Sequence, residues 1–89
     1  MVRISEEKIN RIKSNILSLL YERFPQSLFT AEIAKLEARD EEFIKKLMFE
    51  LKDVSLVIAI KKNPKGDFYS RRIRWRLSNQ AYSAYKQHV

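Results

Sequence analysis

The chain has 89 residues, 45% of them hydrophobic, with a single glycine, no cysteine, one histidine and a formal net charge of +7. That length predicts one domain over residues 1–89, and a chain without cysteine has neither disulfides nor thiolate metal sites. No apolar run approaches the ~20 residues of a membrane span, and the N-terminus lacks the apolar core of a signal peptide, so we expect a cytoplasmic protein without a membrane partner.

The first expected element is an amphipathic helix over residues 6–23. Its apolar residues recur at intervals of three or four positions, namely Ile4, Ile9, Ile12, Ile16, Leu20 and Phe24. Ser5 is a favourable N-cap, and Glu6 and Glu7 suit the positive end of the helix dipole. Pro25 ends the helix, and the stretch SLF that follows is long enough only for a bridging strand.

Two shorter helices are expected next, over residues 30–38 and 40–53. Thr30 is the expected N-cap of the first, in which Ile33 and Ala34 face inward, and Asp40 is the expected N-cap of the second. The buried face of the third helix is predicted to contain Phe43, Ile44, Leu47, Met48 and Leu51. Its solvent side is predicted to carry Glu41, Glu42, Lys45, Lys46, Phe49 and Lys52.

From Val54 the helical period gives way to a strand pattern, which predicts a hairpin over residues 54–77. The run VSLVIAI is β-branched and continuous, as in a strand covered on both faces, and NPKGD reads as a turn. The return strand alternates, with Tyr69, Arg71, Ile73, Trp75 and Leu77 on one face and Ser70, Arg72, Arg74 and Arg76 on the other. Ser78 then caps a last helix over residues 78–89, where Ala81, Tyr82 and Tyr85 share a face.

The positive charge is concentrated in this hairpin. Residues 61–76 hold seven basic side chains and one acidic one, whereas residues 31–53 have a net charge of −2. Alternate arginines on one strand face lie roughly 6.6 Å apart, a spacing comparable to that of phosphates along a nucleic-acid strand. A simpler alternative is that the basic residues only keep an edge strand soluble.

The order helix, short strand, helix, helix, strand, turn, strand, helix resembles the winged helix-turn-helix family. The resemblance covers residues 6–77 and depends on Thr30, Glu32-Ile33-Ala34, Asp40, Ile44, Met48, Leu51 and Leu56-Val57. The sequence departs from the family at Glu37-Ala38-Arg39, where a glycine usually stands between two apolar residues. The resemblance implies a mainly α fold with a small β-hairpin, the wing, and DNA binding with the third helix in the major groove.

The charge pattern and the resemblance together predict a nucleic-acid-binding site formed by Lys45, Lys46, Phe49, Lys52, Lys61, Lys62, Lys65, Arg72, Arg74 and Arg76. Asp40, Glu41 and Glu42 would oppose phosphates there, unless they only complement the helix dipole. Trp75 and Tyr69 could stack on unpaired bases, although a tryptophan between Ile73 and Leu77 is more typical of a core. Phe49 could contact a thymine methyl, pack on a partner protein or lie beneath the first helix.

The sequence favours a DNA-binding protein, either a small transcription regulator or a chromatin-associated factor located at the nucleoid. The alternatives are a winged-helix module that binds proteins in a larger assembly, and a binder of RNA or ribosomes. We expect no enzyme, cofactor or metal site, because His88 is nearly terminal and one glycine cannot form a glycine-rich phosphate loop. The amphipathic first and C-terminal helices predict a homodimer, in which Tyr82 and Tyr85 either close the core of their own chain or supply a dimer contact.

Overall fold

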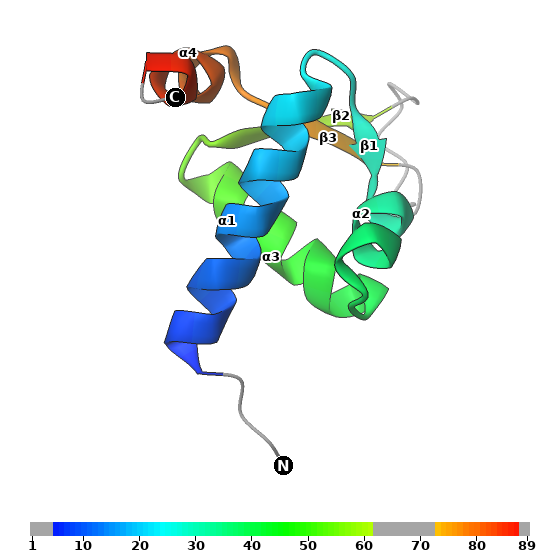
Figure 1. Ribbon diagram of the computed structural model, residues 1–89. Coiled ribbons are helices and arrows are strands. Elements are labelled where there is room, and N and C mark those ends of the chain that lie inside the picture. The colour runs from blue at the N-terminus through cyan, green and yellow to red at the C-terminus, as the bar shows by residue number, and fades with distance from the viewer. Residues whose placement is uncertain (1–4, 62–72, 88–89) are drawn as a thin grey trace.

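The computed structural model describes residues 5–61 and 73–87 (Figure 1). The predicted turn NPKGD, together with Lys62, Lys65, Tyr69, Arg72 and His88, lies outside the described residues. The elements are α1 (Glu6–Arg23), β1 (Leu28–Phe29), α2 (Thr30–Glu37), α3 (Glu41–Asp53), β2 (Val57–Lys61), β3 (Ile73–Leu77) and α4 (Asn79–Gln87). Their order and the mainly α composition confirm the predicted fold class.

The three strands form an antiparallel sheet in the order β1-β3-β2, so β3 is the central strand. Val57 pairs with Leu77 and Lys61 with Ile73, while Leu28 of the short strand pairs with Trp75. In Figure 1 the sheet lies above α2 and α3, and α1 crosses in front of α3. The short strand expected at residues 27–29 therefore adds a third strand to the predicted hairpin.

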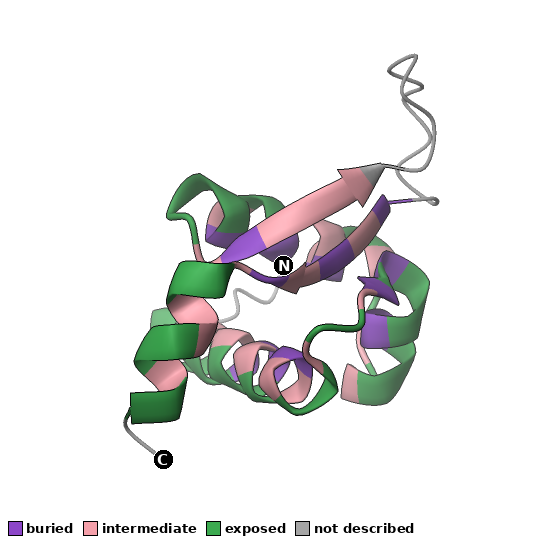
Figure 2. Cartoon of the chain, turned by 90° about the horizontal axis from the view of Figure 1, so that it is seen from above, coloured by how far each residue is buried: buried purple, intermediate pink, exposed green. Residues whose placement is uncertain are grey.

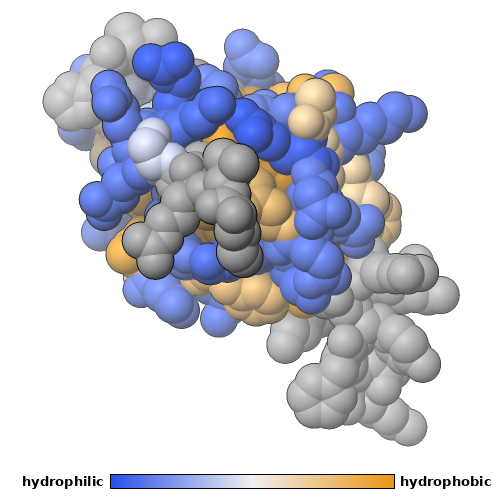
Figure 3. Space-filling model, turned by 90° about the horizontal axis from the view of Figure 1, so that it is seen from below, coloured by the Kyte–Doolittle hydropathy of each residue, from blue (hydrophilic) through white to orange (hydrophobic). Residues whose placement is uncertain are grey.

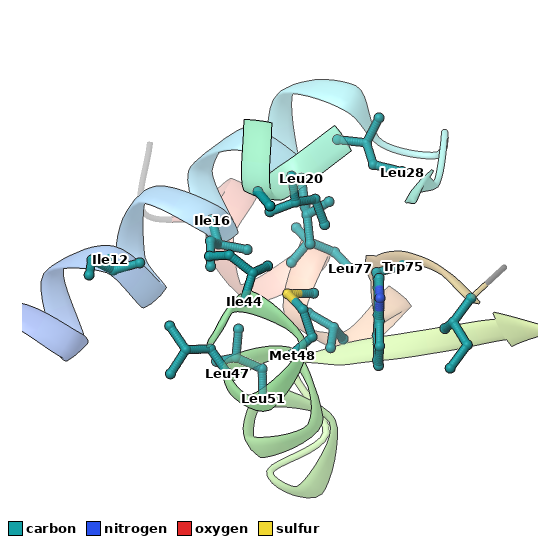
Figure 4. Close-up of a cluster of buried hydrophobic side chains, with 14 residues drawn as sticks. Ile12, Ile16, Leu20, Leu28, Ile44, Leu47, Met48, Leu51, Trp75 and Leu77 are labelled. Atoms are coloured by element: carbon teal, nitrogen blue, oxygen red, sulfur yellow. The ribbon is translucent and has the colours of Figure 1, made fainter. Parts of the chain in front are cut away.

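The core lies between α1, α3 and the inner face of the sheet (Figure 4). Its fully buried side chains include Ile16 and Leu20 of α1, Ile44 and Met48 of α3, and Trp75 of β3. Each large apolar side chain that is fully buried contributes about 1.5–3 kcal/mol to the free energy of folding. The predicted apolar periods of α1, α3 and β3 are confirmed, except that Phe43 is only half-buried.

Three of the predicted N-caps are confirmed by side-chain hydrogen bonds. Ser5 Oγ accepts from the backbone N–H of Lys8 at 3.2 Å, and Asp40 Oδ2 accepts from that of Phe43 at 3.2 Å. Ser78 Oγ accepts from the N–H of Ala81 at 3.0 Å. Side-chain oxygens thus satisfy backbone donors that the first turn of a helix leaves free.

The fourth predicted N-cap, Thr30, is wrong. The N-cap of α2 is Phe29, whose backbone N–H donates to Glu32 Oε1 at 3.0 Å. Thr30 is the first helical residue and is completely buried, and its hydroxyl accepts a hydrogen bond from Trp75 Nε1 at 2.8 Å. The Thr30 hydroxyl, which the local pattern assigned to the N-cap, therefore accepts instead from Trp75, 45 positions away in the sequence.

The turn between α2 and α3 contains Ala38 in the left-handed conformation, with φ 55° and ψ 45°. The N–H of Ala38 donates to the carbonyl of Lys35 at 3.2 Å, and that of Arg39 donates to the carbonyl of Ala34 at 2.9 Å. Glycine is the usual residue for such a helix end. The departure from the family pattern at residues 37–39 therefore leaves a tight turn in place, with alanine in a glycine conformation.

Aromatic rings join α4 to the C-terminal end of α1. Tyr82 stacks on Phe24 and on Tyr21, with ring centroids 3.9 and 5.3 Å apart. The ring centroid of Tyr85 lies 4.8 Å from that of Tyr21, and the hydroxyl oxygen of Tyr85 is 2.6 Å from Ser18 Oγ. The two tyrosines therefore pack within their own chain, which is the first of the two predicted alternatives.

Candidate nucleic-acid interface

α3 is oriented by the apolar residues that it buries, and this leaves its opposite side in solvent. Lys46 and Lys52 are exposed on α3 and form no salt bridge among the described residues. Figure 3 shows the molecule from below, where hydrophilic side chains surround a smaller hydrophobic area. Two mobile ammonium groups on an exposed helix are suited to phosphate contacts.

Two acidic residues of α3 are paired with lysines. Lys45 Nζ lies 3.1 Å from Glu42 Oε2, and Lys13 Nζ of α1 lies 2.7 Å from Glu50 Oε1. These pairs partly neutralise the negative charge of Glu42 and Glu50. An exposed ion pair contributes only about 0.2–1 kcal/mol, so an approaching phosphate can compete with Glu42 for Lys45.

Phe49 lies on the exposed side of α3, as predicted, with 38% of its surface accessible. Its ring meets the ring of Trp75 edge-on, with centroids 5.3 Å apart and an interplanar angle of 89°. Edge-to-face geometry is a favourable arrangement for aromatic rings. Phe49 is therefore held against β3 while part of its ring stays accessible to a ligand.

Trp75 is fully buried, which confirms its predicted place in the core. Its indole N–H donates to Thr30, and the ring of Phe49 packs against the Trp75 ring system at a right angle. A buried ring has no free face to offer a base, so the alternative in which Trp75 forms a stacking platform is wrong.

Arg74 and Arg76 lie on the outer face of β3, because they alternate with the buried residues Ile73, Trp75 and Leu77. Both are half-buried, and Figure 2 shows this intermediate burial alternating with buried residues along β3. Their guanidinium groups lie over aromatic rings. The guanidinium carbon of Arg74 is 5.4 Å from the ring centre of Phe29, and that of Arg76 is 5.6 Å from the ring centre of Phe24.

The structure does not bring these arginines together with the α3 lysines. α3 packs toward the inner face of the sheet, where Phe49 meets Trp75, and the arginines project from the opposite face. The sequence did not indicate that the rings of Phe29 and Phe24 lie beneath these guanidinium groups. One of these contacts follows from the pairing of β1 with β3, since Phe29 and Arg74 are cross-strand partners and such partners share a face of the sheet.

The remaining predicted site residues belong to the connection between β2 and β3. Lys61 is the last residue of β2, and Lys62, Lys65 and Arg72 fall outside the described residues. The described ranges contain no group of three or more His, Cys, Asp or Glu side chains that could hold a metal ion. None of the helices in residues 5–61 and 73–87 is long and apolar enough to cross a membrane.

Solved structures of bacterial regulators share this arrangement of helices and strands. A mutant of MepR from a multidrug-resistant S. aureus clinical isolate superposes with a TM-score of 0.70 at 19% identity, over 86% of this chain and 53% of that one. A mutant of Lactococcus lactis ZitR in the apo form gives a TM-score of 0.68 at 23% identity, over 92% and 57%. A MarR family transcriptional regulator from Silicibacter pomeroyi DSS-3 superposes with a TM-score of 0.66 at 14% identity, over 85% of this chain and 48% of that one.

This chain is a winged-helix domain. The recognition helix of the fold corresponds to α3, and its wing to the hairpin of β2 and β3. The domain spans about half the length of the solved structures that it matches. Its sequence matches no protein-family model and no curated protein.

Proposed function

We propose that this winged-helix domain binds duplex DNA, with residues 1–89 acting as one unit. The observation that carries the proposal is the position of four basic residues, because Lys62, Lys65, Arg71 and Arg72 lie between β2 and β3 with Asp67 as the one acidic residue of that connection. In a winged helix this connection is the wing, which contacts the backbone or the minor groove beside the recognition helix.

The proposed contacts come from two places. Lys46 and Lys52 would contact phosphates from α3, with Lys45 joining them when its pair with Glu42 opens. From the connection between the strands, the proposed phosphate contacts are Lys61, Lys62, Lys65 and Arg72. Phe49 adds an exposed apolar group on α3, which could contact a thymine methyl.

The sequence also predicts phosphate contacts from Arg74 and Arg76. We do not include them in the proposed DNA contacts, because their guanidinium groups lie on the outer face of the sheet and not on the side of α3. A straight duplex that follows α3 would have to turn around the sheet to reach them.

We also propose that the protein is a small transcription regulator or a chromatin-associated factor of the nucleoid, and not an enzyme. Support comes from structural neighbours described as MarR family transcriptional regulators. A homodimer through α1 and α4 would present two wings to DNA. No residue of α4 is fully buried within the chain, so α4 retains accessible surface for a second copy even though Tyr82 and Tyr85 face α1.

DNA binding is tested by fluorescence anisotropy with labelled duplex DNA, single-stranded DNA and duplex RNA of the same sequence. We expect the tightest binding to duplex DNA, with a logarithm of affinity that falls linearly with the logarithm of salt concentration. Equal or tighter binding to RNA would favour the RNA alternative, and no binding to any of the three would refute the proposal. Sedimentation equilibrium in the same buffer tests the dimer, and a monomer at high micromolar concentration would refute it.

A further inference from the structure

The outer face of the sheet carries basic and aromatic side chains that the proposed DNA contacts do not use. We call this surface the arginine face, defined by Phe24, Phe29, Ile58, Ile60, Arg74 and Arg76. The strand register supports this grouping for the residues of the sheet, because Arg74 pairs with Phe29 and with Ile60, and Arg76 pairs with Ile58. Cross-strand partners project from the same side of a sheet. Phe24, at the C-terminal end of α1, is included because its ring lies beneath the guanidinium group of Arg76.

The two guanidinium groups of the arginine face have no acidic partner among the described residues. The salt bridges found there join Lys13 to Glu50 and Lys45 to Glu42. Arg76 Nη1 donates to neutral oxygens, the carbonyl of Leu77 at 2.9 Å and Asn79 Oδ1 at 3.3 Å. The buried Nε of Arg74 has no hydrogen-bond partner within residues 5–61 and 73–87. The positive charge of this surface is therefore uncompensated in the described part of the chain.

The composition of the arginine face is that of a protein interface. Arginine and aromatic residues are enriched at the centres of such interfaces, where lysine is depleted. Phe29 is 37% exposed, and Ile58 and Ile60 are half-buried beside the arginines. The guanidinium groups rest on rings, so binding would immobilise them at a smaller entropic cost than extended surface lysines. These features favour a protein ligand over a nucleic-acid backbone.

The spacing of the arginines indicates the shape of that ligand. Alternate residues on a strand lie roughly 6.6 Å apart, and alternate residues of an extended peptide have the same separation. Carboxylates pair with guanidinium groups through two parallel hydrogen bonds. A segment of the form Glu-x-Glu-x-Leu would place both carboxylates and the leucine on one side, where the leucine can contact phenylalanine or isoleucine.

We propose that the arginine face binds an extended acidic segment of a partner protein, with carboxylates at alternate positions. This second binding surface goes beyond DNA recognition and does not depend on it. The probe is a labelled synthetic peptide that contains Glu-Ser-Glu-Ser-Leu between Gly-Ser flanks. Its matched control is the same peptide with glutamine in place of both glutamates.

Anisotropy titrations with the wild-type protein and three variants test this proposal. The glutamine peptide should bind about tenfold more weakly than the acidic one, and Arg74→Gln/Arg76→Gln should lose at least about tenfold in affinity for the acidic peptide. Lys8→Gln/Arg11→Gln removes the same charge from exposed positions of α1 and should change that affinity by less than about threefold. Arg74→Lys/Arg76→Lys keeps the charge without the bidentate geometry, and should bind with intermediate affinity.

Amide chemical shifts then locate the bound peptide, and we expect changes at Phe29, Ile58, Ile60, Arg74 and Arg76. Absence of peptide binding, or equal losses in the arginine variant and the α1 control, would overturn the proposal. It would also be overturned if Arg74→Gln/Arg76→Gln reduced affinity for duplex DNA while peptide binding was unchanged. If Arg74→Gln/Arg76→Gln is unfolded, Arg74→Lys/Arg76→Lys takes its place, and the affinities of that variant for the acidic peptide and for duplex DNA decide in the same way. A protein that binds the peptide but no DNA would refute only the DNA proposal.

Discussion

Within residues 5–61 and 73–87, two residues other than glycine adopt positive φ angles, Ala38 with φ 55° and Ser55 with φ 64°. The Cβ atom of an alanine in this conformation crowds the following carbonyl, which destabilises it by about 1–2 kcal/mol relative to the right-handed region. Ala38 ends α2 and determines the direction in which the chain enters α3. The orientation of α3 is thus set at a residue whose side chain disfavours the turn.

Ala38→Gly should therefore stabilise the domain. Glycine relieves the crowding but loses more chain entropy on folding, by roughly 0.5–1 kcal/mol, so we expect a net gain of up to about 1 kcal/mol in the free energy of unfolding. Urea unfolding followed by the fluorescence of Trp75 measures this change. The control is Ala84→Gly at an exposed position within α4, which should destabilise by about 0.5–1 kcal/mol. A loss of stability in both variants would contradict the strained turn.

The buried hydrogen bond between Trp75 and Thr30 gives a second prediction at this scale. Thr30→Val keeps the shape of the side chain but leaves the indole N–H without an acceptor, which should cost about 1–3 kcal/mol of unfolding free energy. Thr30→Ser retains the hydroxyl and should keep the indole hydrogen bond. The Nε1 proton resonance of Trp75 reports this bond directly. An unshifted resonance and unchanged stability in Thr30→Val would show that the hydroxyl is not its partner.

At the scale of elements, the sequence predicted whatever depends on local pattern. The apolar periods of α1 and α3, the alternation of β3 and the caps Ser5, Asp40 and Ser78 all follow from neighbouring residues. The misplaced cap at Thr30 and the unforeseen rings beneath Arg74 and Arg76 arise from tertiary contacts. No local rule relates Trp75 to Thr30, or Arg76 to Phe24, because packing alone brings these elements together.

The docking of α4 also depends on tertiary contacts, and it can be tested separately. Tyr82→Ala removes the stacking on Phe24 and Tyr21, and should destabilise α4 by about 1–3 kcal/mol. Tyr85→Phe keeps the ring and loses only the contact with Ser18, for which about 0.5–1.5 kcal/mol is expected. Amide hydrogen exchange should show faster exchange throughout α4 in Tyr82→Ala, with α3 unchanged. Equal protection of α4 in wild type and Tyr82→Ala would contradict this account of its docking.

For the whole molecule, the described residues define two surfaces on different sides of the sheet. The side of α3 presents Lys46, Lys52 and part of Phe49, while the opposite face of the sheet presents Arg74 and Arg76 over phenylalanine rings. The alternation in the sequence placed Arg74 and Arg76 opposite the apolar residues of their strand, but it did not show on which side of the sheet α3 packs, so all these basic residues were predicted to form one site. The fold divides the predicted site between two surfaces.

The most direct test of the account is the salt dependence of duplex DNA binding by a variant with glutamine at Lys61, Lys62, Lys65 and Arg72. Each phosphate contact contributes about 0.9 to the slope of log affinity against log salt. We expect the four substitutions to lower the magnitude of that slope by up to about 3.6 and to weaken binding to every duplex similarly, while Arg74→Gln/Arg76→Gln leaves it unchanged. An unchanged slope in the fourfold variant, or a loss confined to Arg74→Gln/Arg76→Gln, would contradict a phosphate-binding wing in this domain.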